Sequence, residues 1–335
     1  MSRNRDLTIE ETFNLAIKNH QNNNLQDAQN YYQKVLKIDS NHLVALNNLG
    51  IIFKKLGESQ RAKDCYKKII GINPNHTHAQ NNLGIIFQNL GETQKARKCH
   101  EKAIEIDPDY VDAHYNLGVI FQNLGETQKA RKCHEKAIEI DPDYVDAHNN
   151  LGVIFQDLGE TQKARKCYEK VIKLNPSHEN AHNNLGNIFI ELGDLQKALD
   201  CLKKVIEINP NNIYSLNNLG RILQDLGEHQ KARKCYEKAI KLNPSNINSI
   251  NNLAKLSKLY RFDYKTNNDK TIFKKLIISL FNEGNIKTSF FFENAKSILF
   301  SDEEQSQLAE VITSNLLLSN KILQRLLGEE LFHLM

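Results

Sequence analysis

The chain has 335 residues, of which 40% are hydrophobic and 25% are charged. Its 44 Lys and Arg residues are nearly balanced by 40 Asp and Glu residues, which argues against a nucleic-acid partner and against a membrane-binding surface. The longest apolar runs, such as Leu276–Phe281, are far shorter than the roughly 20 residues that span a bilayer, and the polar N-terminal segment predicts no secretory signal. The composition therefore excludes a membrane protein, a collagen-like chain and a small disulfide-stapled domain.

The sequence repeats itself every 34 residues from its first third onwards. The segment Ile86–His114 recurs without a change as Ile120–His148. All six prolines and all six cysteines fall on the same 34-residue spacing: Pro74, Pro108, Pro142, Pro176, Pro210 and Pro244, with Cys65, Cys99, Cys133, Cys167, Cys201 and Cys235. This regularity indicates a tandem array of one structural unit.

Each unit predicts two helices. In Val111–Tyr144, numbered here as positions 1 to 34, apolar residues recur three and four positions apart in two separate stripes. Gly125 at position 15 suits a left-handed helix end, and Pro142 at position 32 stops the second helix. The small residues Gly118 and Ala130 mark the closest approach of the two helices. No segment alternates as a strand does, so the expected fold class is all-α.

These residues resemble the tetratricopeptide repeat: Leu at position 7, Gly at 8, an aromatic residue at 11, Gly at 15, Ala at 20, an aromatic residue or His at 24, and Pro at 32. Seven units run from Ile9 to Asn246, the first of them degenerate, and Ile247–Tyr260 adds one more helix. The resemblance implies a right-handed superhelical solenoid that binds segments of other proteins in its concave groove. Stacking of neighbouring hairpins is also the physical means by which such units bury their apolar faces.

The array is expected to occupy residues 1–260, and residues 261–335 have a different composition without Pro or Cys. This second region predicts further helices, with a capping box from Ser301 to Glu304 and a leucine stripe that reaches the last residue. We interpret it as a C-terminal helical cap or as the truncated start of a further domain.

No catalytic or nucleotide-binding motif occurs in the sequence, so we expect no enzyme activity, catalytic residue, metal site or cofactor in this chain. The cysteines are interpreted as free, semi-buried thiols between helices, which suits the reducing cytoplasm. The position-4 imidazoles of His114, His148 and His182 are interpreted as packing groups with a hydrogen-bonded nitrogen, with a metal or pH-sensing role as the alternative. The basic run Gln94–Cys99 and its copies are expected to pair with Glu at i,i+4 rather than to bind a polyanion.

One polar series points to a ligand. Position 6 is Asn in every unit although Asn is a mediocre helix former: Asn14, Asn48, Asn82, Asn116, Asn150, Asn184, Asn218, and Asn252 in the extra helix. Position 5 is often Asn as well. A carboxamide has a donor and an acceptor, so it can pair with both polar groups of a peptide unit.

This pattern resembles the asparagine ladder of O-linked N-acetylglucosamine transferases, whose geometry places positions 2, 5, 6, 9, 12 and 13 in the groove. By that resemblance the asparagines bind peptide backbone and face water in the free protein. The alternative is an Asn that only bonds within its own array. Acidic groove residues, namely Asp112, Asp146, Asp157, Glu191 and Asp225, favour a basic segment.

Two functions follow from the sequence. The first is a cytoplasmic scaffold that binds an extended protein segment through Asn48, Asn82, Asn116, Asn150, Asn184, Asn218 and Asn252, with Asp157, Glu191 and Asp225 tuning the choice of partner. The second is the recruiting arm of a glycosyltransferase or methyltransferase whose catalytic domain is absent from this chain.

Overall fold

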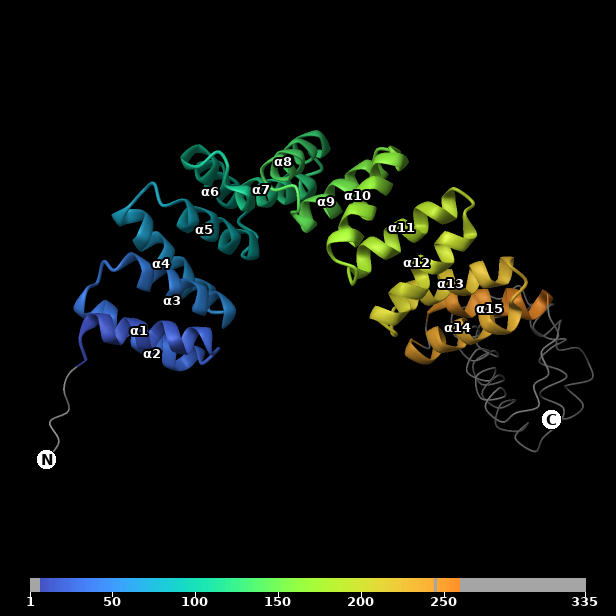
Figure 1. The fold of residues 1–335 in the computed structure, drawn as a ribbon, viewed down its shortest axis with the longest axis horizontal. Coiled ribbons are helices and arrows are strands. Elements are labelled where there is room, and N and C mark those ends of the chain that lie inside the picture. Colours follow the sequence, from blue (N-terminus) through green and yellow to red (C-terminus); the bar gives the residue numbers. More distant parts are fainter. Residues whose placement is uncertain (1–6, 244–245, 260–335) are drawn as a thin grey trace, which may run out of the picture. The chain divides into compact units, whose positions relative to one another are not determined.

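The computed structural model of the protein describes residues 7–243 and 246–259, which form fifteen helices and no strand (Figure 1). The expected all-α class is therefore confirmed for this part of the chain. The helices predicted after residue 260, with the capping box at Ser301, lie outside the described residues.

The chain divides into two compact units, with the boundary after Ala181. The first unit holds α1 (Ile9–Gln21), α2 (Leu25–Ile38), α3 (Leu43–Lys55), α4 (Ser59–Ile72), α5 (Thr77–Asn89), α6 (Thr93–Ile106), α7 (Val111–Asn123), α8 (Thr127–Ile140), α9 (Val145–Asp157), α10 (Thr161–Leu174) and the start of α11 (Glu179–Glu191). The second unit holds the rest of α11, α12 (Leu195–Ile208), α13 (Ile213–Asp225), α14 (His229–Leu242) and α15 (Ile247–Leu259).

Odd-numbered and even-numbered helices pair into hairpins, as the repeat predicts. In the first unit α1 packs on α2, α3 on α4, α5 on α6, α7 on α8 and α9 on α10. The second helices α2, α4, α6 and α8 also contact the first helix of the next hairpin. In the second unit α13 packs on α14, which contacts α15. The contacts join neighbours in sequence, so the hydrophobic core of each unit is built hairpin by hairpin.

Two kinds of turn set the length of the unit. The glycine at position 15 has a positive φ in every complete hairpin after the first, for example +71° at Gly125, which is the left-handed conformation that glycine adopts without strain. In the turn between repeats, the side chain at position 31 accepts a hydrogen bond from the backbone amide two residues on, as Asp107 does from Asp109 at 3.1 Å. This second contact explains why Asp or Asn precedes the proline.

The glycine at position 8 allows a ring from the second helix to pack directly on the backbone of the first. A Cβ added at Gly118 would lie 2.6 Å from the ring of His134, and one at Gly220 would lie 2.4 Å from Tyr236. Ala130 at position 20 is fully buried beside this contact. The predicted close approach of the two helices at Gly118 and Ala130 is therefore confirmed.

Within the described ranges, no helix combines the length and the hydrophobicity that crossing a membrane requires.

Candidate functional site

The first helix of each hairpin, which is the odd-numbered one, buries one side and leaves the other accessible. In α7, Ala113, Leu117 and Ile120 are buried, Asn116 and Val119 are half-buried, and Asn123 is exposed. Apart from α1 of the degenerate first repeat, the other first helices are likewise buried at positions 3, 7 and 10 and more accessible at positions 6, 9 and 13 where the structure describes them. We call the accessible side, formed by positions 2, 6, 9 and 13, the first-helix face.

The predicted asparagines form one row on this face in each unit. The first unit contributes Asn48, Asn82, Asn116 and Asn150, and the second contributes Asn184, Asn218 and Asn252, all of them half-buried. Contacts between α5 and α7, and between α13 and α15, bring successive first helices together within each unit. Asn14 of the degenerate first repeat is exposed.

Three row asparagines are held by the repeat that precedes them. The Nδ2 of Asn48 donates to the Tyr32 hydroxyl at 3.0 Å, that of Asn116 to Asn81 Oδ1 at 3.1 Å, and that of Asn218 to Asn187 Oδ1 at 3.3 Å. The expectation that these side chains face only water is therefore wrong for these three. Each bond uses one of two N–H groups, so Oδ1 and the second N–H stay available, and the amide plane is oriented in advance.

The remaining row residues are less constrained. The side chains of Asn82 and Asn184 make no hydrogen bond to other described residues. The Asn150 side chain lies close to the hydroxyl of Tyr115, and its Oδ1 lies 3.5 Å from Asn149 Nδ2. The row therefore combines anchored and free carboxamides.

Position 5 is buried in two repeats and half-buried or exposed in the others, so the accessibility that the resemblance implied for it does not hold at Asn81 and Asn217. Asn81 is only 3% exposed, because its Oδ1 lies 2.9 Å from His100 Nδ1 in the hairpin core and also accepts from Asn116. Asn217, which is 8% exposed, donates to Ser249 Oγ at 2.8 Å in the next repeat. Asn81 and Asn217 join neighbouring repeats through Asn116 and Ser249, and sequence reasoning missed them because these contacts are 35 and 32 residues away.

The predicted acidic residues lie at the edges of the first-helix face. Asp157, Glu191 and Asp225 are exposed in the last turns of α9, α11 and α13, and none forms an ion pair with another described residue. Asp112 and Asp146 lie in the first turns of α7 and α9. The helices α5, α7 and α9 contain no Lys or Arg, so their carboxylates are not neutralised locally.

The cysteines and two of the position-4 histidines, His114 and His148, have the structural roles expected of them. None of the six cysteines forms a disulfide bond with another, and burial raises the pKa of the Cys99 thiol to about 11. Nε2 of His114 lies 2.8 Å from the carbonyl of Pro108, and Nε2 of His148 lies 2.9 Å from that of Pro142. No group of His, Cys, Asp and Glu that could hold a metal ion occurs among the described residues.

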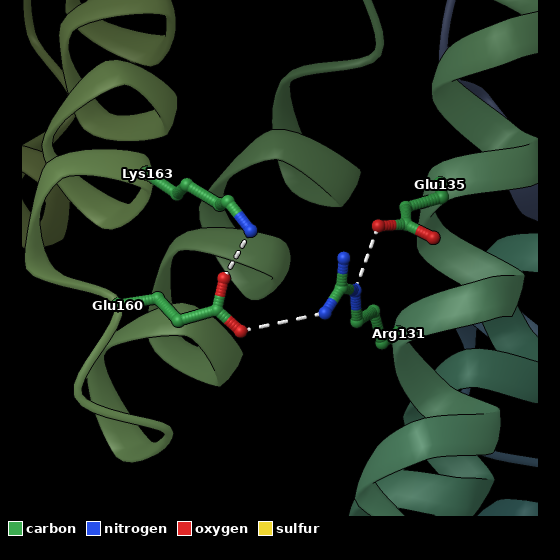
Figure 2. Close-up of polar contacts among 4 residues, drawn as sticks. All are labelled: Arg131, Glu135, Glu160 and Lys163. Atoms are coloured by element: carbon green, nitrogen blue, oxygen red, sulfur yellow. Dashed lines mark hydrogen bonds and ion pairs between the residues drawn. The ribbon is translucent and has the colours of Figure 1, made fainter.

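The basic runs form the ion pairs that their spacing predicts. Figure 2 shows Arg131 of α8 donating to Glu135 of the same helix at 2.8 Å and lying 3.4 Å from Glu160, which also pairs with Lys163. The Arg131 guanidinium also lies 5.0 Å from the ring centroid of Phe155 in the next repeat. These charges therefore connect neighbouring repeats instead of forming an open basic patch.

Comparison with known families and structures agrees with this architecture. Models described as the tetratricopeptide repeat match residues 13–42, 44–76, 111–144, 145–178 and 177–245, and a TPR repeat model matches 89–125. No curated protein matches the chain.

Solved structures show the same fold at low identity. The C-terminal part of a TPR repeat-containing protein from Cytophaga hutchinsonii has a TM-score of 0.55 at 19% identity, covering 72% of this chain and 99% of that one. PilF from Pseudomonas aeruginosa has a TM-score of 0.53 at 22% identity, covering 66% and 97%. A tetratricopeptide repeat protein from Parabacteroides merdae has a TM-score of 0.52 at 18% identity, covering 75% and 98%.

The family matches together span more than half of the sequence, and they coincide with hairpins whose glycine turns and ring-on-glycine contacts follow the 34-residue unit. The chain therefore belongs to the tetratricopeptide repeat family, whose members generally act as non-catalytic scaffolds for protein interactions.

Proposed function

We propose that this protein is an interaction scaffold that binds an extended peptide segment on its first-helix face, and that the position-6 asparagines pair with the backbone of that segment. The observation that carries the proposal is the anchoring of Asn48, Asn116 and Asn218 by the preceding repeat. An amide that is already oriented loses less rotamer entropy when it binds a ligand.

The chemistry of the row suits a peptide backbone. Each anchored carboxamide retains an acceptor for a peptide N–H and a donor for a peptide C=O. Beside it, position 9 in the first unit carries the half-buried aliphatic residues Ile51, Ile85, Val119 and Val153. This neighbouring apolar row would contact side chains of the segment, while the asparagines would bind its backbone with little dependence on sequence.

The charge of the face favours a basic segment. Asp112, Asp146 and Asp157 lie on first helices that contain no Lys or Arg. Exposed carboxylates of this kind act mainly on association rate and partner choice, and their effect falls as salt rises. Free cysteines suit the reducing cytosol, and we propose a cytoplasmic location for the complex.

The test uses the full chain and a library of random twelve-residue peptides displayed on phage. Peptides selected on the wild-type protein are then measured against the variant Asn82→Ala/Asn116→Ala/Asn150→Ala by fluorescence anisotropy. Three lost hydrogen bonds of about 0.5–1.5 kcal/mol each should weaken binding by roughly ten- to thousandfold.

The matched control replaces three exposed asparagines that lie outside the first-helix face: Asn30→Ala/Asn41→Ala/Asn75→Ala. This control should bind as the wild type does. Equal affinities for the row variant and the control would refute the proposal, and so would a loss of binding explained by unfolding of the row variant.

A further inference from the structure

In the first unit, two acidic side chains of the first-helix face lie next to two aromatic side chains and form a cluster with them. It comprises Tyr115 and Asp112 of α7, Asp146 of α9, and Tyr144, which is the N-cap residue of α9. The ring centroids of Tyr115 and Tyr144 are 5.3 Å apart with an angle of 43° between the planes. We call these four residues the aromatic–acidic cluster.

Hydrogen bonds hold the cluster in place. The Tyr144 hydroxyl donates to Asp112 Oδ1 at 2.9 Å, and the side chain of Asn150 in the asparagine row lies close to the Tyr115 hydroxyl. On its other side the Tyr115 ring packs against His134, at a centroid distance of 5.7 Å. The cluster therefore adjoins the asparagine row and has little freedom to rearrange.

The two carboxyl groups of the cluster have no basic ion-pair partner among the described residues. Burial and then the Asp146 carboxylate raise the pKa of Tyr115, while burial and then the hydrogen bond to Asp112 raise that of Tyr144. Both phenols are thus neutral at neutral pH and lie beside the carboxyl groups of Asp112 and Asp146. Neither Asp112 nor Asp146 forms an ion pair with a described residue, and α5, α7 and α9 supply no Lys or Arg.

We propose that the aromatic–acidic cluster is the subsite for one cationic side chain, Lys or Arg, of the bound segment. A cation is attracted by the faces of tyrosine rings and by the adjacent carboxylates, and no other side-chain class gains from both. This inference rests on the proposed function, because the cation arrives on the segment whose backbone the neighbouring asparagines bind. The subsite would make one position of the bound segment prefer a positive charge, whereas the asparagine row binds the backbone with little dependence on sequence.

The experiment selects random twelve-residue phage peptides on three proteins: the full-length wild type, Asp112→Asn/Asp146→Asn, and the charge-matched control Asp27→Asn/Asp109→Asn. Asp27 and Asp109 are exposed and lie outside the first helices. The wild type and the control should enrich Lys or Arg at one fixed position, whereas Asp112→Asn/Asp146→Asn should enrich peptides without that preference.

Binding of one selected peptide separates the ring contribution from the charge contribution. Replacing its enriched Lys by Met should weaken binding to the wild type about tenfold at low salt, and change binding to Asp112→Asn/Asp146→Asn much less. Tyr115→Leu should lower the affinity for the Lys peptide, whereas Tyr115→Phe should restore most of it because the ring is retained.

The outcomes distinguish this inference from the proposed function. Peptides that are enriched without any Lys or Arg preference, and that still depend on Asn82, Asn116 and Asn150, would overturn the cationic subsite alone. Failure to enrich any peptide would overturn both. A basic preference that survives unchanged in Asp112→Asn/Asp146→Asn would also overturn the subsite, because the charge would then act elsewhere.

Discussion

Two histidines buried in the hairpin cores should make the stability of the protein depend on pH. His100 and His134 are each 0% exposed, and they occupy position 24, where Tyr66 and Tyr168 stand in the flanking repeats. Burial lowers the pKa of both rings from the ordinary value of 6.5 to about 4. Each ring has one nitrogen, Nε2 of His100 and Nδ1 of His134, without a hydrogen-bond partner among the described residues.

The sign of the effect follows from proton binding. Between pH 6.5 and pH 4 the unfolded chain binds a proton on each of His100 and His134, while the folded chain keeps both rings neutral. Their contribution to the free energy of unfolding is therefore complete above pH 6.5 and is lost as pH falls towards 4. Between pH 7 and pH 5 the loss amounts to about 2 kcal/mol for each ring.

The variant His100→Tyr/His134→Tyr removes this term and keeps the packing, because the flanking repeats place a tyrosine against the same glycine. Gln88 and Gln122 occupy the same repeat position as Gln156, whose Oε1 accepts a hydrogen bond from the Tyr168 hydroxyl at 3.2 Å. Each introduced tyrosine hydroxyl therefore has an equivalent acceptor. Urea unfolding followed by circular dichroism at pH 7 and pH 5 should show the wild type losing about 4 kcal/mol more than the variant. Parallel pH profiles for the two proteins would refute the reasoning, since the remaining titratable groups are common to both.

Three further predictions concern packing, surface charge and thiol reactivity. Gly220→Ala should lower the free energy of unfolding by about 1–3 kcal/mol, because the added Cβ would overlap the ring of Tyr236. Gly186→Ala, whose added Cβ would have its nearest contact at 3.4 Å, should be neutral or stabilising by up to about 1 kcal/mol. Thermal denaturation of both variants checks this prediction. A double-mutant cycle between Arg131→Ala and Glu160→Ala should give a coupling below about 1 kcal/mol that vanishes in 1 M salt, because both side chains are partly exposed. Burial raises the pKa of five of the six thiols to about 11. A thiol reagent at pH 8 should therefore react slowly with the folded protein and rapidly with all six cysteines after denaturation. Fast reaction of the folded protein would contradict the burial of these thiols.

The hairpins could be predicted from the sequence because their signals are local and repeated. The turn glycine at Gly125, the close approach at Gly118 and the pairing of Arg131 with Glu135 all depend on residues within one unit. The Asp and Asn side chains that close the turns between repeats were missed, although Asp before Pro at positions 31 and 32 was a usable signal.

The role of each asparagine could not be assigned in the same way. Asn recurs at both positions 5 and 6, and only tertiary contacts separate their roles: Asn81 is buried against His100 of the same hairpin, whereas Asn116 keeps part of its amide accessible. These contacts depend on how the helices pack on one another in three dimensions. The spacing of residues along the sequence does not specify that packing. Tertiary packing likewise brings Tyr115 of α7 into contact with Tyr144, the N-cap residue of α9.

Binding of backbone-modified peptides to the full chain tests the central claim most directly. A selected twelve-residue peptide is compared with analogues in which single amide N–H groups are replaced by ester oxygens, and with an alanine scan of its side chains. If the asparagine row binds the backbone, esters at the contacted positions should weaken binding by about 0.5–1.5 kcal/mol each, and alanine substitutions outside the basic position should have little effect. Esters that bind as tightly as the parent peptide, with affinity lost across the alanine scan instead, would contradict backbone recognition by the asparagines.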